Sequence, residues 1–387
     1  MMRFFTAGES HGRSLIAFIE GVPAGISITS DDIRRALARR RLGLGRGKRM
    51  AFEQDEVTIL SGIRHGLSMG SPIAIEIGNT EWPKWTTAMS PDPVDGESKS
   101  ELTRPRPGHA DLAAMAKYGF ENARPSLERS SARETAARVA CGEIAKAFIR
   151  QVSGIEVLSH VVQLGSARNE PATRPVPSDL AAIDADPARV FGDSSEFVEA
   201  VEKASADKET LGGVVEVLAY GVPVGLGSYS QWDTRLDGRI AGALMSIQAC
   251  KGVEIGEGFG FASLPGSQAH DPIVLRDGQL GRTQNNAGGI EGGISNGQVL
   301  WARAAMKPIP TVPVGLPSVD LSTMEPSKAH YQRSDITAVP AFGVVAEAML
   351  ALVLADALHE KLGGDSLSEI RRNLQSYEEN LAWPVEH

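Results

Sequence analysis

The sequence is poor in cysteine and in aromatic residues, and each shortage excludes a class of protein. Its 387 residues include two cysteines, Cys141 and Cys250, too few for a disulfide framework and without the spacing of a metal site. Both lie in small, apolar, helix-like contexts, which favours core thiols in a reducing compartment. Aromatic residues make up only 5% while 41 residues are glycine, a composition typical of tight turns and small-residue packing.

Signals for export, for a membrane span and for nucleic-acid binding are also missing. The N-terminus turns polar too early for a secretory signal. The most apolar stretch, 344–354, is interrupted by Glu347 and is well short of the ~20 residues that a membrane span needs. The net charge of −9 argues against nucleic acid as the main partner. We therefore expect a cytoplasmic protein that binds neither nucleic acid nor a membrane.

A short pattern occurs twice along the chain. Residues 21–25 are Gly-Val-Pro-Ala-Gly, and residues 221–225 are Gly-Val-Pro-Val-Gly. Each copy follows an apolar, strand-like run and leads into a helical pattern, and this shared order predicts two related halves. We expect one domain over residues 1–387, with halves at about 1–200 and 201–365 and a C-terminal tail.

The periodicity predicts four central helices and several half-buried strands. The helices are expected over residues 31–41, 133–150, 236–249 and 341–361. The last is apolar nearly all round, so it must be covered on most sides. Alternating segments predict antiparallel strands with one covered face, over residues 15–19, 57–60, 73–77, 155–162, 214–218 and 299–304. The predicted fold class is α+β, with long central helices between antiparallel sheets and a pseudo-two-fold internal repeat.

Two stretches have little periodicity. Residues 80–109 contain Trp82 and Trp85 among many prolines and glycines, and they predict either a structured active-site loop or a long connection. Residues 165–195 are rich in Pro, Asp and Ala, which is typical of a surface insertion.

Positive charge is concentrated in turn-rich segments of this acidic chain. Such groups are either solvated surface charge or sites for small anions, and the neighbouring turn residues favour anion binding about as much as the alternative. The three groups are Arg39, Arg40, Arg41, Arg46, Lys48 and Arg49; Arg104, Arg106 and His109; and Arg124, Arg129, Arg133 and Arg138.

Two histidines are candidates for acid–base chemistry near neutral pH. His11 lies between Ser10 and Gly12, where it would approach a ligand closely or simply bond within its turn. His109 follows Arg-Pro-Arg-Pro-Gly, and two prolines would hold that loop extended, with its arginines in place.

Three further segments have the residue types of a phosphate or flat-ligand site. Residues 129–135 place arginines and serines at the expected start of a long helix, where backbone N–H groups bind anions or a serine simply caps the helix. Residues 284–293 are rich in glycine and amides, and they predict either backbone contact with a ligand or a set of tight turns. Residues 307–311 form a stiff Lys-Pro-Ile-Pro-Thr loop after a strand. No metalloprotease, paired-cysteine, serine-nucleophile or calcium-loop motif occurs, so we expect no metal.

Three long motifs together resemble the signatures of the chorismate synthase family. They are Gly8-Glu9-Ser10-His11-Gly12 through Pro23, Glu128-Arg129-Ser130-Ser131-Ala132-Arg133-Glu134-Thr135 through Gly142, and Arg333-Ser334-Asp335 through Met349. The resemblance runs from about Arg3 to Gly364, and three such motifs in order are highly specific.

The resemblance implies a β–α–β sandwich fold, a homotetramer and a lyase of the shikimate pathway. Family members convert 5-enolpyruvylshikimate 3-phosphate to chorismate and phosphate by anti-1,4-elimination, with reduced FMN and no net redox change. The substrate carries a phosphate and two carboxylates, which suits basic clusters in an acidic chain. NADPH is a possible reductant for the flavin.

Site residues follow by the same resemblance. His11 would favour the reduced, anionic flavin, His109 would protonate the leaving phosphate, and Asp335 with Ser10 would help the flavin accept the C6 proton. The positions that match FMN contacts are Arg129, Ser130, Ser131, Gln248, Ala249, Gly292, Lys307, Pro308, Ile309, Pro310, Thr311 and Arg333. Arg40 and Arg46 match nicotinamide-phosphate positions, and they would equally suit the substrate phosphate.

The chain departs from the family pattern at two places. Pro310 stands where the family usually has Ser, which removes a hydroxyl and an N–H from the Lys-Pro loop. Ser334 and Ile336 replace a common His and Pro around Asp335. Two other functions share the same predicted pocket: a flavin-dependent oxidoreductase and a non-catalytic flavin or phosphometabolite binder.

Overall fold

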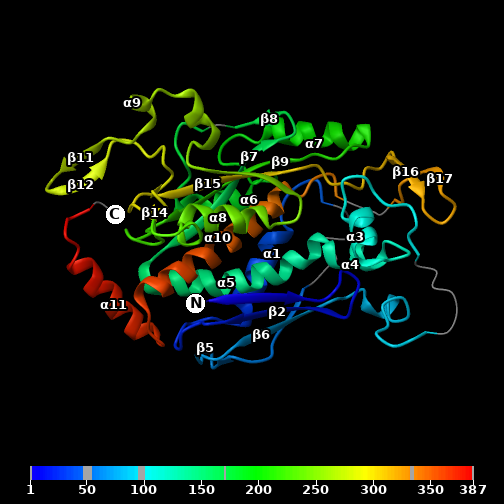
Figure 1. Cartoon of the computed structure of the whole chain (residues 1–387), viewed down its shortest axis with the longest axis horizontal. Coiled ribbons are helices and arrows are strands. Elements are labelled where there is room, and N and C mark those ends of the chain that lie inside the picture. Colours follow the sequence, from blue (N-terminus) through cyan, green and yellow to red (C-terminus); the bar gives the residue numbers. More distant parts are fainter. Residues whose placement is uncertain (1, 47–54, 95–100, 170, 332–334, 386–387) are drawn as a thin grey trace.

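Two antiparallel sheets enclose a layer of helices in the computed structural model, which describes residues 2–46, 55–94, 101–169, 171–331 and 335–385 (Figure 1). The first sheet has the order β1 (Arg3–Ala7), β2 (Ser14–Glu20), β6 (Ile73–Gly78), β3 (Glu56–Ile59). The second has the order β10 (Cys250–Ile255), β15 (Leu300–Met306), β9 (Gly213–Tyr220), β7 (Glu156–Leu164), β8 (Ala167–Arg168). Every paired neighbour is antiparallel, so the predicted sandwich and its α+β class are confirmed.

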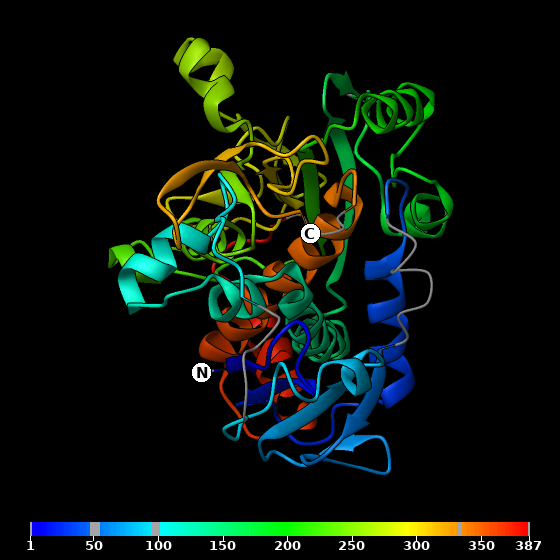
Figure 2. The same ribbon diagram turned by 90° about the vertical axis from the view of Figure 1, so that its right-hand side faces the viewer.

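The middle layer consists of four helices, α1 (Ser30–Arg41), α5 (Thr135–Ser153), α8 (Leu236–Met245) and α10 (Val339–Leu362). A capping box is present at α1, where Thr29 and Asp32 bond each other's backbone N–H groups. Helix α8 ends four residues earlier than predicted, because the chain turns there into β10 and Ala249 adopts a positive φ of 66°. Figure 2 shows the same layers from the side, with the first sheet at the bottom.

The remaining elements surround these layers. They are β4 (Ile63–Arg64), β5 (Leu67–Ser68), β11 (Ile273–Arg276), β12 (Gln279–Arg282), β13 (Ile290–Glu291), β14 (Ile294–Ser295), β16 (Pro317–Asp320), β17 (Glu325–Lys328), α3 (Asp111–Tyr118), α4 (Arg124–Ser130), α6 (Leu180–Ala185), α7 (Ser195–Asp207), α9 (Gly266–Ala269), α11 (Leu367–Glu379) and the 3₁₀ turns η1 (Trp82–Lys84), η2 (Ala132–Glu134), η3 (Pro177–Asp179), η4 (Trp232–Thr234) and η5 (Gly258–Ser263).

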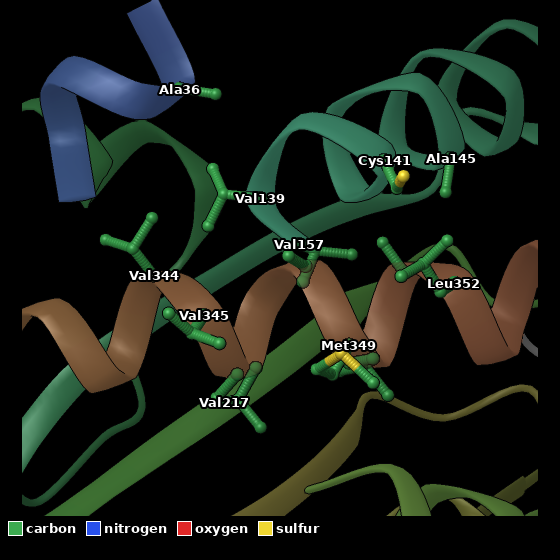
Figure 3. Close-up of a cluster of buried hydrophobic side chains, with 14 of the residues drawn as sticks. Ala36, Val139, Cys141, Ala145, Val157, Val217, Val344, Val345, Met349 and Leu352 are labelled. Atoms are coloured by element: carbon green, nitrogen blue, oxygen red, sulfur yellow. The ribbon is translucent and has the colours of Figure 1, made fainter. Parts of the chain in front are cut away.

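Helices α5 and α10 form the centre of the core. Figure 3 shows Val139 and Cys141 of α5 beside α10, whose Val345 and Met349 face Val217 of β9. The two helices approach closely at Gly142 of α5, where an added Cβ would lie 2.6 Å from the Cα of Ala348. Such a spacing is possible only without a side chain, so Gly142 sets the distance between the two helices. Cys141 and Cys250 are both free thiols and buried, as predicted.

Helix α10 carries one charged residue into this core. The Glu347 side chain is fully buried and accepts hydrogen bonds from Arg39 of α1 (Nη1 to Oε2, 2.8 Å), from Ser159 of β7 (2.8 Å) and from Lys146 of α5. Arg189 lies 3.5 Å from it, and both Arg39 and Arg189 also bind Asp184. Burial alone would raise the pKa of Glu347, but the charges of Arg39 and Lys146 hold it well below its usual range.

The repeated sequence pattern corresponds to a repeated structure. After β2, Ser68 of β5 accepts the Ile26 N–H (2.9 Å) and donates to the Pro23 carbonyl (2.5 Å). After β9, Ser295 of β14 accepts the Leu226 N–H (2.8 Å) and donates to the Pro223 carbonyl (2.6 Å). Both turns therefore rest on the serine of a two-stranded hairpin that lies far along the chain.

The strand orders of the two sheets match as well. The order β1-β2-β6-β3 of the first sheet corresponds to β7-β9-β15-β10 of the second, with α1 and α5 matching α8 and α10. We propose that the boundary between the halves lies near Gly154 rather than residue 200, because β7 takes the place of β1 and begins the second half.

Residues 165–195 are more than a surface insertion, and that prediction was wrong. Helix α6 and its flanking segments cover the outer face of the second sheet, where Ile183 packs with Leu158, Leu218 and Trp301. The segment also contributes Asp184 and Arg189 to the buried charges around Glu347. Its polar composition concealed this role, because the buried polar groups pair with residues distant in sequence.

Helix α10 is longer than the apolar stretch that predicted it. Its 24 residues are long and apolar enough to cross a membrane by length and composition alone, contrary to the expectation that this stretch is too short. However, 89% of its most apolar window is buried inside the protein. The apolar surface of α10 is therefore explained by its place between α5 and the second sheet.

We expect Glu347→Gln to lower the free energy of unfolding by about 3–5 kcal/mol at pH 7, since it leaves the buried Arg189 and the partly buried Arg39 and Lys146 short of an anionic partner. The low pKa of Glu347 means that the unfolded chain binds its proton first as pH falls. Wild-type stability should therefore decrease below about pH 4.5, more steeply than that of the variant. Urea unfolding from pH 7 to 3 measures both effects.

Glu360→Gln is the matched control on the same helix. Glu360 pairs with Arg239 at 3.0 Å, but its side chain is 59% exposed, so its loss should cost less than about 1 kcal/mol. Equal destabilisation by the two variants would contradict the role assigned to Glu347.

Alanine substitutions at two helical glycines should have opposite effects. Gly142→Ala adds a methyl group where Ala348 leaves no space, and should destabilise the protein by about 1–3 kcal/mol. Gly242→Ala in α8 adds the same group where nothing lies within 4 Å, and should stabilise it by up to about 1 kcal/mol through helix propensity. Thermal and urea unfolding of both variants give the sign of each change; a stabilising Gly142→Ala would show that α5 and α10 are not in tight contact.

Candidate active site

The loop between β1 and β2 presents Ser10 and His11. The Asn79 amide, just after β6, donates to the carbonyls of Ser10 (3.2 Å) and Gly12 (2.9 Å). On the other side the Ser10 N–H donates to the Glu128 carbonyl of α4 (3.0 Å), and the Ser131 hydroxyl donates to the Ser10 hydroxyl (3.1 Å). The loop is therefore held from two sides, which gives its side chains defined positions.

The imidazole of His11 is paired with a buried carboxylate. Its Nδ1 lies 2.9 Å from Oε1 of Glu128, whose Oε2 accepts the His11 backbone N–H (2.8 Å). Arg124 donates to the same carboxylate (3.1 Å), and the ring of Trp85 stacks against the imidazole with centroids 4.0 Å apart. Burial by itself would raise the pKa of Glu128, but its bonds from His11 and Arg124 lower it. The Trp85 contact favours the structured-loop interpretation of this part of residues 80–109.

His109 has a similar partner in a second cluster. Its Nδ1 lies 2.5 Å from Oδ1 of Asp111, a fully buried residue at the start of α3. Asp111 also accepts hydrogen bonds from the Arg106 side chain (2.9 and 3.1 Å) and backbone N–H (3.1 Å). Burial would raise the pKa of Asp111, but the hydrogen bonds and charges of His109 and Arg106 hold it far below its usual range.

The His109 loop rests on the Lys-Pro loop that follows β15. Arg106 donates to the Thr311 hydroxyl (3.1 Å), and Lys307 donates to the Gly108 carbonyl. Pro310 also lies next to Gly108, where an added Cβ would be 3.9 Å from its Cβ. The structure thus brings together residues 106–111 and 307–311, about 200 positions apart in sequence, as a site shared by both segments requires.

A third imidazole, His330, belongs to this cluster and was not predicted. Its Nδ1 bonds the Arg104 carbonyl (2.7 Å), and its Nε2 lies 4.0 Å from Asp111. Burial, with the nearby charge of Arg106, lowers the pKa of His330, so the ring is neutral near pH 7. No local sequence pattern distinguished His330, since only the folded chain brings it to Asp111.

Several predicted flavin positions are linked through Glu134. Gln248 donates to Glu134 (2.7 Å), as do Thr6 and Arg138, and Arg129 in turn donates to Thr6 and to the Gly8 carbonyl. The Lys307 N–H donates to the Ala249 carbonyl (3.0 Å), which joins this cluster to the His109 side. Ser130 Oγ and Gln248 Oε1 are buried without a hydrogen-bond partner in the described part of the chain. Such polar atoms suit a polar ligand that reaches this cluster.

The long helix begins two residues later than predicted, and the anion site at its start stays a prediction. Arg129 and Ser130 lie in the last turn of α4, and Ser131 caps the short η2 turn by accepting the Arg133 N–H (3.3 Å). Helix α5 itself begins at Thr135. The 3₁₀ turn between the helices redirects the chain, which propensity alone did not reveal.

Arg40 and Arg46 lie in separate ion pairs. Arg40, 5% exposed, approaches Asp55 (3.8 Å) and donates to Thr135 (3.4 Å), and Arg133 also approaches Asp55 (3.6 Å). Arg46 pairs with Asp335 at 3.1 Å, so one predicted phosphate ligand directly contacts the predicted acid–base group.

Some predicted residues are not brought together. Gly292 lies in the β13–β14 hairpin beside the start of α8, whereas Gln248 follows the end of this helix. The ten residues of α8 rise 1.5 Å each, so its two ends are roughly 15 Å apart. Ser10 bonds Ser131 while Asp335 bonds Arg46, so their joint role stays a prediction. Arg333, Ser334, Lys48 and Arg49 lie outside the described residues.

Among the residues that the structure describes, cationic side chains outnumber carboxylates around these clusters although the whole chain is acidic. The cations are Arg40, Arg41, Arg46, Arg106, Arg124, Arg129, Arg133, Arg138 and Lys307, and the carboxylates are Asp55, Asp111, Glu128, Glu134 and Asp335. The local excess of positive charge, largely shielded from water, attracts multiply charged anions. In the described ranges no group of His, Cys, Asp and Glu could hold a metal ion.

Two surface cavities lie elsewhere. One, of about 550 Å³, is lined by Leu112, Met115 and Phe120, and the other, of about 450 Å³, by Ile255, Phe261 and Leu264. Neither is lined by a residue predicted for catalysis or flavin binding. Their charged lining residues, Glu101 and Glu121 in the first and Asp237 in the second, are acidic, which does not suit a multiply charged anion.

An α+β sandwich with two histidine–carboxylate pairs among arginines suits an enzyme that binds anionic ligands. The family model described as chorismate synthase matches residues 2–359. Three proteins named chorismate synthase are similar in sequence to this chain. Those of Streptomyces coelicolor and Paenarthrobacter aurescens are 58% and 60% identical to it, each over 98% of both chains. That of Mycobacterium avium is 58% identical over 99% of this chain and 97% of that protein. A solved structure titled "Crystal Structure of Chorismate Synthase" has a TM-score of 0.78 and 41% identity, with 97% of each chain covered.

The chain belongs to the chorismate synthase family. It is therefore an enzyme of the shikimate pathway that acts on a small molecule. The solved relative also agrees with the predicted fold.

Proposed function

We propose that the enzyme converts 5-enolpyruvylshikimate 3-phosphate to chorismate and phosphate by anti-1,4-elimination in the presence of reduced FMN. The observation that carries this proposal is the pairing of His11 and His109 with buried carboxylates, at the positions that match the family's acid–base groups. The local excess of arginine suits a substrate with a phosphate and two carboxylates.

The residues around Glu134 fit a phosphorylated flavin. Arg129, the buried hydroxyl of Ser130 and the amide of Gln248 offer charged and polar contacts, and Lys307 adds a cation at the junction with the His109 loop. Pro310 contributes only an apolar surface there, so the loop holds the ligand through Lys307 and Thr311. When bound, reduced FMN supplies transient electron density that protein side chains cannot supply.

His109 donates a proton to the departing phosphate in this proposal. Arg106, which binds Asp111 and Thr311, keeps the loop in place, and the Lys307 ammonium group offsets the growing negative charge. Proton transfer of this kind contributes roughly 10²–10⁴-fold. His11, between Glu128 and Trp85, would lie beside the flavin and stabilise its anionic form.

Arg40 and Arg46 would bind a phosphate, either of the substrate or of NADPH acting as reductant. The deep burial of Arg40 beside Asp55 and Thr135 favours the compact substrate phosphate. Asp335, held by Arg46, would assist removal of the C6 proton.

The assembly and the location of the enzyme are part of the same proposal. A homotetramer in the cytoplasm would cover exposed aromatic side chains such as Tyr229 and Trp232, which are 78% and 82% exposed. The free thiols of Cys141 and Cys250 suit a reducing compartment.

An anaerobic assay with 5-enolpyruvylshikimate 3-phosphate, photochemically reduced FMN and NADPH tests the proposed reaction. We expect phosphate and chorismate in equal amounts, with many turnovers per flavin and no consumption of NADPH. Stoichiometric NADPH oxidation would instead indicate an oxidoreductase, and tight FMN binding without turnover would indicate a binding protein. Repeating the assay with oxidised FMN and NADPH shows whether the enzyme reduces its own flavin.

His109→Ala should lower turnover about 10²-fold or more, because it removes the proposed proton donor. FMN affinity, measured by titration of flavin fluorescence, should change less than about threefold, since the Glu134 cluster stays intact. Turnover equal to that of the native enzyme would remove His109 from the mechanism.

A further inference from the structure

The two site histidines share one arrangement although they lie on unrelated loops. Each Nδ1 contacts a carboxylate that is almost wholly buried, Glu128 for His11 (2.9 Å) and Asp111 for His109 (2.5 Å). Each carboxylate also binds a guanidinium group, from Arg124 (3.1 Å) and from Arg106 (2.9 Å). Arg106 additionally contacts the His109 ring, with its Nη2 3.0 Å from Nδ1 and 3.1 Å from Nε2.

We propose that Glu128 and Asp111 are the positioning residues of His11 and His109. Each carboxylate accepts the Nδ1 proton of its histidine, which leaves Nε2 as the nitrogen that exchanges protons with the ligands. This assignment rests on the proposed function for its chemical purpose, but the tautomers themselves are properties of the protein alone.

The guanidinium groups keep each carboxylate in place and ionised. The Asp111 side chain is fully buried and the Glu128 side chain is 1% exposed, so neither carboxylate can turn towards water. Burial would raise both pKa values, yet the bonds from the histidine and arginine partners lower them, and both groups stay anionic throughout the neutral range. A fixed anion at Nδ1 selects one tautomer and one ring orientation.

Other charged groups around the two imidazoles are mostly cationic. His109 faces Arg106, the neutral His330 lies on the far side of Asp111, and Lys307 binds the adjacent Gly108 carbonyl. His11 has Arg124 next to its carboxylate and Trp85 against its ring. In each case the carboxylate is an anionic group in direct contact with the imidazole.

Both carboxylates have a structural contact as well, which the test must separate. Glu128 accepts the His11 backbone N–H and Asp111 accepts the Arg106 backbone N–H. A variant could therefore lose activity because a loop moves. The two explanations differ in one respect: if the carboxylate acts through its histidine, its substitution lowers activity only when that histidine is present.

Double-mutant cycles make this separation. Asp111→Asn and Glu128→Gln keep size and hydrogen-bonding capacity but remove the charge, and each should lower kcat about 10–100-fold with KM within about threefold. In the His109→Ala background, Asp111→Asn should then lower kcat by less than about twofold. In the His11→Ala background, Glu128→Gln should likewise lower kcat by less than about twofold. Equal losses with and without the histidine would overturn the proposal.

Nitrogen-15 spectra of histidine-labelled protein, recorded without flavin or substrate, give a readout besides activity. The chain has eight histidines, so His11→Gln and His109→Gln variants assign the two signals. We expect the Nδ1–H tautomer for both rings in the native protein, and a mixture of tautomers in Asp111→Asn and Glu128→Gln, because an amide can donate as well as accept. An Nε2–H tautomer in the native protein would overturn the assignment. If the tautomers are as expected but no phosphate is released, the proposed function fails and the positioning role stands.

Glu216→Gln is the control for loss of a buried carboxylate–histidine pair. Glu216 lies 3.3 Å from Nε2 of the buried His160, and both point away from α10 on the outer face of the second sheet. The variant should be less stable but have native kcat and native tautomers at His11 and His109. A comparable fall in kcat would show that buried carboxylates act here through general stability.

Discussion

The burial of one carboxylate, Glu347, within reach of three cations is the interaction on which the rest of the structure depends. It joins α10 to α1 through Arg39, to α5 through Lys146 and to the segment over the second sheet through Arg189. Such a group is costly to desolvate, so it is stable only when every partner is in place. Since Arg40 follows Arg39 on α1 and Arg133 lies just before α5, the same network also determines where the arginines of the site lie.

The active-site region shows the same principle at smaller scale. Almost every cation there has a carboxylate or carbonyl partner, yet the carboxylates are too few to neutralise the group. Paired arginines cannot collapse onto one another or turn towards solvent, so their charge is preorganised for an incoming anion. The chain combines a net charge of −9 with a cationic interior site. The net charge favours solubility, while the local positive charge attracts anionic ligands.

Much of the fold could be predicted because it depends on local periodicity. Alternation revealed the strands, the continuous apolar face revealed α10, and the repeated Gly-Val-Pro turn revealed the internal duplication. Pairings across the chain could not be predicted in this way: Asp184 and Arg189 lie in a segment of polar composition, and only the folded chain shows that they reach Glu347. The site residues were predicted from a family resemblance, whereas their partners Glu128, Asp111 and His330 became visible only as spatial neighbours.

The contact at Gly142 has a consequence for how ligands enter. With the backbone of α5 in contact with Ala348 of α10, the two halves are closely packed along the middle of the molecule, so hinging them apart would break this contact. Admission and release of the ligands would then depend on surface segments around the site rather than on a movement of the two halves. If only surface segments move while the central helices stay packed, the enzyme can exclude water around its ligands without rearranging its core.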